Sequence, residues 1–123
     1  MKNEEIIQLT QELIHRGTQF DLDFLENIYD ENLIFIFVDS QNQIKTLNKE
    51  DNMNFFRNLK GKNAEPLNTY AEFHYADSDG ENGFVILSRK MQLSENEQDF
   101  LFNIYWKKQE NQWKIVREVV YIK

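Results

Sequence analysis

The chain has 123 residues, of which 41% are hydrophobic and 14% aromatic, and its formal net charge is −7. This composition predicts one folded domain over residues 1–123, and the absence of cysteine excludes disulfides, thiolate metal sites and cysteine nucleophiles. With 14 basic residues against 21 acidic ones, we expect no nucleic-acid partner and no binding to a membrane surface.

The N-terminal residues enter an amphipathic pattern at once and show no apolar leader. The longest apolar run, residues 33–38, is far shorter than the ~20 residues that span a bilayer. Together with the lack of cysteine, these features predict a cytoplasmic protein. No cluster of histidines and carboxylates has the spacing of a transition-metal site, so we expect no metal ion and no cofactor.

Three segments in the first half of the chain have apolar residues at helical spacing, with capping residues or glycines at their ends. Between the second and the third, a run of six apolar residues is followed by a polar turn and a shorter segment, which is typical of a strand pair. The expected elements are helices over 3–16, 21–29 and 48–61 and strands over 33–38 and 43–47.

The second half predicts four consecutive strands. The clearest signal lies at 99–122, where two aromatic and β-branched runs flank the polar tract 107–112, as in a long antiparallel hairpin. No helix separates these strands, so they form an antiparallel meander and the chain as a whole is α+β. The expected strands span 68–76, 84–93, 100–108 and 113–122, joined by turns at 77–83, 94–98 and 107–112.

Two segments resemble the nuclear transport factor two-like (NTF2-like) superfamily, also called SnoaL-like or cystatin-like: FLENIYDENLIFIFVDSQNQIKTLNKEDNMNFFRNL at 24–59 and YWKKQENQWKIVREVVYI at 105–122. The chain is most similar to its small bacterial members of unassigned function. The resemblance implies a cone, in which a strongly curved antiparallel or mixed sheet wraps around the N-terminal helix. Three helices would lie on one face, with a cavity between them and the sheet. Relatives include isomerases, dehydratases and cyclases, and many pair as homodimers through the outer sheet face.

The last two expected strands are apolar on both faces. On the strand over 100–108, Phe100, Phe102, Ile104 and Trp106 face one way, and Leu101 and Tyr105 face the other. A strand with one solvated face would alternate more cleanly between apolar and polar residues. We therefore expect a second copy of the chain to cover the outer face and form a homodimer.

His74 is the one histidine on an expected strand. In one interpretation it lies in the cavity as a general base, with Glu72 as its orienting acid. In the alternative, which the pattern favours, Tyr70, Glu72 and His74 form the polar outer face of the strand.

Arg117 and Glu118 interrupt an otherwise apolar last strand. Strict alternation places Arg117 on the same face as Trp113 and Ile115. If that face is the concave one, Arg117 binds a carboxylate or an oxyanion in the cavity. Alternatively, Arg117 pairs across strands with Glu72 or Asp99 and only closes the sheet.

Many aromatic rings and few convergent ionisable groups favour a protein that binds a small apolar or aromatic molecule in the cavity. We expect the ligand to contact Tyr29, Phe56, Tyr105 and Trp106. Two alternatives stay open. One is a cofactor-free isomerase, dehydratase or cyclase that transfers protons in the cavity, with His74 or an aspartate as the base. The other is a dimeric assembly module without ligand chemistry.

Overall fold

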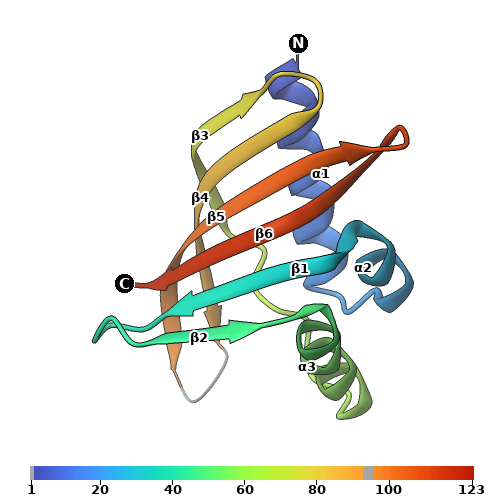
Figure 1. Ribbon diagram of the computed structural model, residues 1–123. Helices are drawn as coiled ribbons and strands as arrows, with labels where there is room; N and C mark the ends of the chain where they lie inside the picture. Colours follow the sequence, from blue (N-terminus) through green and yellow to red (C-terminus); the bar gives the residue numbers. More distant parts are fainter. Residues whose placement is uncertain (1, 93–95) are drawn as a thin grey trace.

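Helices form at all three segments with helical spacing in the computed structural model, which describes residues 2–92 and 96–123 (Figure 1). They are α1 (Lys2–Gly17), α2 (Leu22–Ile28) and α3 (Lys49–Gly61). Asp21 caps α2 by accepting a 3.2 Å hydrogen bond from the Phe24 backbone N–H. Asn48 and Asp51 form a reciprocal capping box at the start of α3, with hydrogen bonds of 2.8 and 3.1 Å.

The strands match the expected ones in number and order: β1 (Tyr29–Val38), β2 (Ile44–Leu47), β3 (Ala71–Ser78), β4 (Asn82–Gln92), β5 (Glu97–Gln109) and β6 (Gln112–Ile122). Their bounds differ where polar residues continue a strand. β1 starts at Tyr29 directly after α2, and β5 begins within the expected turn at 94–98. Residues 93–95, which include the start of that turn and the expected end of the preceding strand, lie outside the described part of the chain.

The turn between β5 and β6 is shorter than the expected turn, which spanned the polar tract 107–112. Only Glu110 and Asn111 leave the ladder, with φ of 50° and 67°. Positive φ at both central residues is the geometry of a type I′ turn, whose twist matches that of the two strands. The polar residues on either side therefore continue the hairpin as parts of β5 and β6.

The six strands form one sheet in the order β2-β1-β6-β5-β4-β3. Neighbouring strands are antiparallel except for β1 and β6, which run parallel, so the sheet is mixed. It curls without closing, and the helices lie on its concave side (Figure 1). The α+β prediction, with a curved sheet around an N-terminal helix, is confirmed.

A bulge in β6 changes which residues face the concave side. Val116 is an extra residue in the ladder with β5, so the residues after it face the opposite way from strict alternation. The pairs on either side of the bulge are Tyr105 with Arg117 and Trp106 with Ile115. As a result Glu118, and not Arg117, is buried on the same face as Ile115. The face predicted for Arg117 by alternation is therefore wrong.

A second bulge lies in β3. Phe73 pairs with Leu87 and Tyr75 with Ile86, which leaves His74 as the unpaired residue between them. The bulge bends this edge strand and exposes the imidazole.

The N-terminal helix α1 packs against β3 and β4 (Figure 1). Gly83 of β4 lets α1 approach closely, because a Cβ at this position would lie 2.6 Å from Cδ1 of Ile6. Trp106 is buried in the same layer and donates from Nε1 to Oγ1 of Thr10 at 3.2 Å. Oγ1 of Thr10 in turn donates to the Ile6 carbonyl at 2.8 Å. None of the described helices is long and apolar enough to cross a membrane.

Candidate functional site

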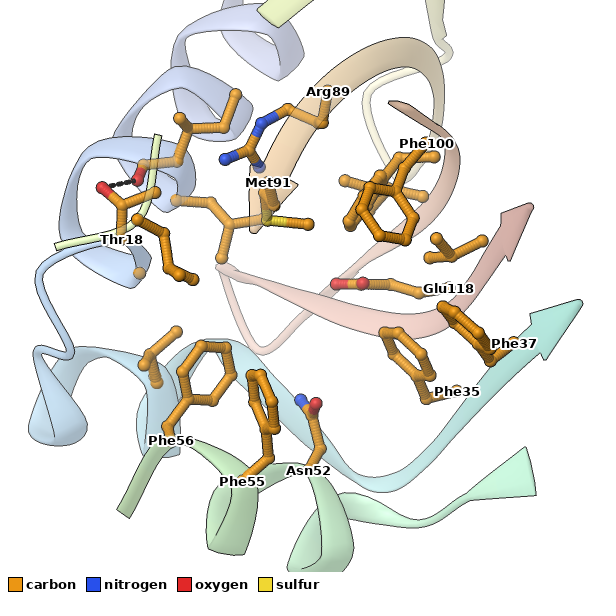
Figure 2. Close-up of a pocket in the computed structure, with 18 of the residues that line it drawn as sticks. Thr18, Phe35, Phe37, Asn52, Phe55, Phe56, Arg89, Met91, Phe100 and Glu118 are labelled. Carbon is orange, nitrogen blue, oxygen red and sulfur yellow. Dashed lines mark hydrogen bonds between the residues drawn. The ribbon is translucent and has the colours of Figure 1, made fainter. Parts of the chain in front are cut away.

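A pocket of about 290 Å³ lies between the concave face of the sheet, the end of α1, and α3. Its walls are mostly apolar. Six phenylalanines line it: Phe35 and Phe37 from β1, Phe55 and Phe56 from α3, and Phe100 and Phe102 from β5. Figure 2 shows the α3 rings and the β1 rings on different sides of the hollow, with Arg89 and Met91 across from α3. We call this hollow the central pocket.

The Glu118 carboxyl points into the middle of the central pocket (Figure 2). The side chain is only 2% exposed, and it is there because the bulge at Val116 turns it inward. Burial raises the pKa of Glu118 to about 7, although a hydrogen bond with Tyr29 and the positive charge of Arg89 oppose the rise. Near neutral pH the carboxyl is therefore present in both its protonated and its ionised form.

Tyr29 brings a hydroxyl group to Glu118 from the junction of α2 and β1. It is buried, and desolvation together with the Glu118 charge raises the pKa of this hydroxyl well above its usual value. The hydroxyl therefore keeps its proton and donates it in the hydrogen bond to Glu118. The α2 helix ends and β1 begins at this residue.

Asn52 supplies the third buried polar group. It lies in the first turns of α3, is 4% exposed, and places its amide beside the Tyr29 hydroxyl. Among the described residues, Nδ2 of Asn52 and Oε1 of Glu118 have no hydrogen-bond partner. Buried polar atoms are nearly always paired in folded proteins. These two unpaired atoms in one pocket are the strongest sign of a ligand.

Arg89 lies deeper on β4 and is 6% exposed. Its Nε and Nη2 donate to the carbonyls of Tyr70 and Asn68, each at 3.0 Å, which ties the connection before β3 to the sheet. The guanidinium also lies 5.6 Å from the centre of the Phe102 ring. Burial lowers the pKa of Arg89, while the Glu118 charge raises it. Arg89 thus has a structural role and also supplies positive potential to the pocket.

The structure brings two of the four expected ligand contacts into the central pocket. Tyr29 and Phe56 line it, whereas Tyr105 and Trp106 do not. Tyr105 faces outward and stacks on Phe84, with ring centres 4.7 Å apart and planes at 15°. Trp106 is buried beneath α1.

The two expected catalytic candidates also lie outside the pocket lining. His74 is on the outer face, with Nε2 2.6 Å from Oγ of Ser88 and 3.8 Å from Oε1 of Glu72. This is the polar outer-face arrangement that the sequence pattern favoured. Arg117 is exposed on the outer face because of the bulge before it.

Sequence reasoning did not identify Glu118, Asn52 or Arg89 as pocket residues. For Glu118 the sequence carries a signal, because two charged residues interrupt an apolar strand, but strict alternation places Arg117 and not Glu118 on the face of Ile115. Arg89 occupies an inward position between Leu87 and Met91, so alternation along β4 would have placed it on the concave side. Asn52 carries no such pattern, because one polar residue in an amphipathic helix is ordinary.

No protein-family model matches the chain, and neither does any curated protein. Solved structures do match along its whole length. An NTF2-like protein from Cytophaga hutchinsonii superposes with a TM-score of 0.77 at 18% identity, covering 100% of both chains. An NTF-2 like protein of unknown function from Silicibacter pomeroyi gives 0.73 at 13% identity, again covering 100% of both. A "putative ketosteroid isomerase" from Parabacteroides distasonis gives 0.66 at 16% identity, covering 98% of this chain and 87% of the other.

At these identities the similarity establishes the fold and nothing more. The chain has the NTF2-like fold, a cone-like α+β architecture, as its resemblance to that superfamily predicted.

Proposed function

We propose that this protein binds a small, largely apolar molecule in the central pocket. The observation that carries the proposal is the combination of apolar, ring-rich walls with two buried polar atoms that have no partner in the described chain, Oε1 of Glu118 and Nδ2 of Asn52. Pockets of this kind bind ligands through apolar contact and fix their orientation with a few polar groups.

The direct test is titration of the ¹⁵N-labelled protein with naphthalene-sized aromatic compounds, followed by NMR. We expect saturable shifts in residues that line the central pocket and a raised melting temperature. Leu67→Trp places a larger side chain in the lining and should weaken binding. Ile44→Trp makes the same kind of change at an exposed site, 67% exposed on β2, and should leave binding unchanged. Absence of saturable shifts with every compound would refute the proposal.

Proton transfer is the second candidate function, and Glu118 favours it. A carboxyl whose pKa is about 7 can both accept and give a proton near neutral pH, and the Tyr29 hydroxyl beside it can polarise a carbonyl group. One structure with the same fold is described as a "putative ketosteroid isomerase". In this candidate function Glu118 replaces His74 as the base, since His74 lies outside the pocket.

The test for proton transfer is exchange of the methyl hydrogens of 2-acetonaphthone in D₂O, observed by ¹H NMR. We expect the protein to accelerate the exchange and Glu118→Gln to abolish the acceleration. His74→Ala is the matched control and should keep it. Exchange at the buffer rate with saturating wild-type protein would exclude this function for that class of carbonyl compound.

We also propose that the outer sheet face pairs with a second copy of the chain. The outer face is defined here by its apolar residues on the central strands: Ile34, Ile36, Phe84, Ile86, Leu101, Tyr105, Val119 and Tyr121. Ile34 and Tyr121 are 39% and 43% exposed in the single chain, which is unusual for side chains of this size at the centre of a sheet.

A further inference from the structure

The polar floor of the central pocket has a specific hydrogen-bonding pattern. Thr18 also lines the pocket, but its hydroxyl donates to the carbonyls of Ile14 and His15 at 2.7 and 3.1 Å. Two nitrogens of Arg89 are used by backbone carbonyls. Among the described pocket residues, the buried side-chain atoms without a partner are therefore one acceptor on Glu118 and one donor on Asn52.

These two atoms belong to neighbouring groups. The Glu118 carboxyl and the Asn52 amide both lie beside the same Tyr29 hydroxyl, and Asn52 lowers the pKa of that hydroxyl, as an N–H that faces its oxygen does. The second N–H of Nδ2 and Oε1 of Glu118 remain for a ligand. A ligand group that pairs with both must present an acceptor and a donor a short distance apart. The donor faces the carboxylate and the acceptor faces the amide N–H₂. A primary amide, a lactam or a cyclic imide has this arrangement in one planar group.

We propose that the ligand of the central pocket is an apolar, ring-containing compound whose one polar group is a carboxamide, lactam or imide. Its N–H donates to Oε1 of Glu118 and its carbonyl accepts from Nδ2 of Asn52. This inference rests on the proposed binding function and names its ligand class. The rest of the compound packs against the phenylalanines, and no described side chain other than Arg89, Glu118 and the rim residue Lys45 offers it a charge.

The main alternative to an amide ligand is a ketone. The two can be distinguished by how their affinities change with pH. An amide N–H prefers the ionised carboxylate, so its binding should release a proton and strengthen as the pH rises from about 6 to about 8. A lone carbonyl prefers the protonated carboxyl, so its binding should weaken over the same range. Among the described residues, Tyr29 and Arg89 act on Glu118 and Lys45 also lines the pocket, and these groups are the same in both cases.

Three naphthalenes of similar shape test the proposal on the wild-type protein: 2-naphthamide, 2-acetonaphthone and 2-isopropylnaphthalene. By calorimetry at about pH 8, we expect the amide to bind about tenfold more tightly than the hydrocarbon, as for one or two net hydrogen bonds. Its affinity should rise with pH and that of the ketone should fall. Equal affinities for all three compounds would overturn the ligand class while leaving the binding function intact. No binding by any of them would count against the binding function itself.

Two variants assign the contacts. Glu118→Met removes the acceptor and keeps the length of the side chain, and Asn52→Leu removes the donor. Each should erase most of the tenfold preference for the amide over 2-isopropylnaphthalene, because the amide then lacks one of its two partners. A preference for the amide that survives in either folded variant would show that the amide binds elsewhere. The wild-type comparison stands without these variants if one of them does not fold.

Discussion

Glu118 is the residue at which stability and function conflict. Its pKa is raised from 4.5 to about 7 because the pocket excludes water from the carboxyl. The unfolded chain loses this proton near the lower value and the folded chain near the higher one. Between them the folded state binds more protons, so the free energy of unfolding falls as the pH rises through this range. At alkaline pH, the difference between the two pKa values lowers the free energy of unfolding by about 3 kcal/mol.

Glu118→Gln removes this ionisation with little change in shape, so the variant should be more stable than the wild type at alkaline pH. We expect its advantage to grow by about 2 kcal/mol between pH 5.5 and pH 8, measured by urea denaturation at several pH values. Glu65→Gln, at an exposed position, is the control and should shift the curve by the same amount at every pH. A pH-independent advantage for Glu118→Gln would show that the carboxyl is solvated in the folded protein.

At the scale of the elements, Gly83 is where α1 lies closest against β4. A methyl group at this position would lie 2.6 Å from Cδ1 and 2.8 Å from Cγ1 of Ile6, which is fully buried. Gly83→Ala should therefore push α1 outward and destabilise the protein by about 1–3 kcal/mol. Chemical denaturation measures the effect. Gly61→Ala is the control, because nothing lies within 4 Å of a Cβ there, and it should be neutral or slightly stabilising.

The elements also show what the sequence could predict. The order of the elements is predicted correctly because its signals are local. These signals are the helix and strand periodicities, the cap at Asn48 and the glycine at the end of α3. The side chains that face the pocket depend on register as well. One extra residue, Val116, exchanges the faces of Arg117 and Glu118. A bulge adds no distinctive residue type, so alternation alone could not detect it.

The pocket itself depends on contacts between distant parts of the chain. Tyr29, Asn52 and Glu118 come from three different elements and meet only after β1 pairs in parallel with β6. The meander of the last four strands was predictable from the short turns, because consecutive strands with tight connections pair as neighbours. The position of β1 beside β6 has no local signal and was not predicted, because the resemblance to the NTF2-like superfamily implied only an antiparallel or mixed sheet.

At the scale of the whole molecule, the two faces of the sheet differ in what covers them. The concave side is covered by helices, whereas the outer face presents Ile34, Tyr121 and their apolar neighbours to water. Asp77 and Arg117 lie in one row of cross-strand neighbours and are separated by Phe84 and Tyr105, so a two-fold pairing can bring opposite charges together. A second copy is the simplest occupant of this face, because a sheet matches a sheet in shape.

Light scattering after gel filtration at micromolar concentration should therefore give about twice the chain mass of 14.9 kDa. Ile34→Glu places a charge in the proposed interface at a position already 39% exposed, so the folded chain should tolerate it while the dimer dissociates. Asn58→Glu adds the same charge on the exposed surface of α3 and should leave the mass doubled. A wild-type mass of one chain at these concentrations would refute the pairing. Ile34 and Tyr121 would then belong to a surface that binds a different partner or that costs solubility.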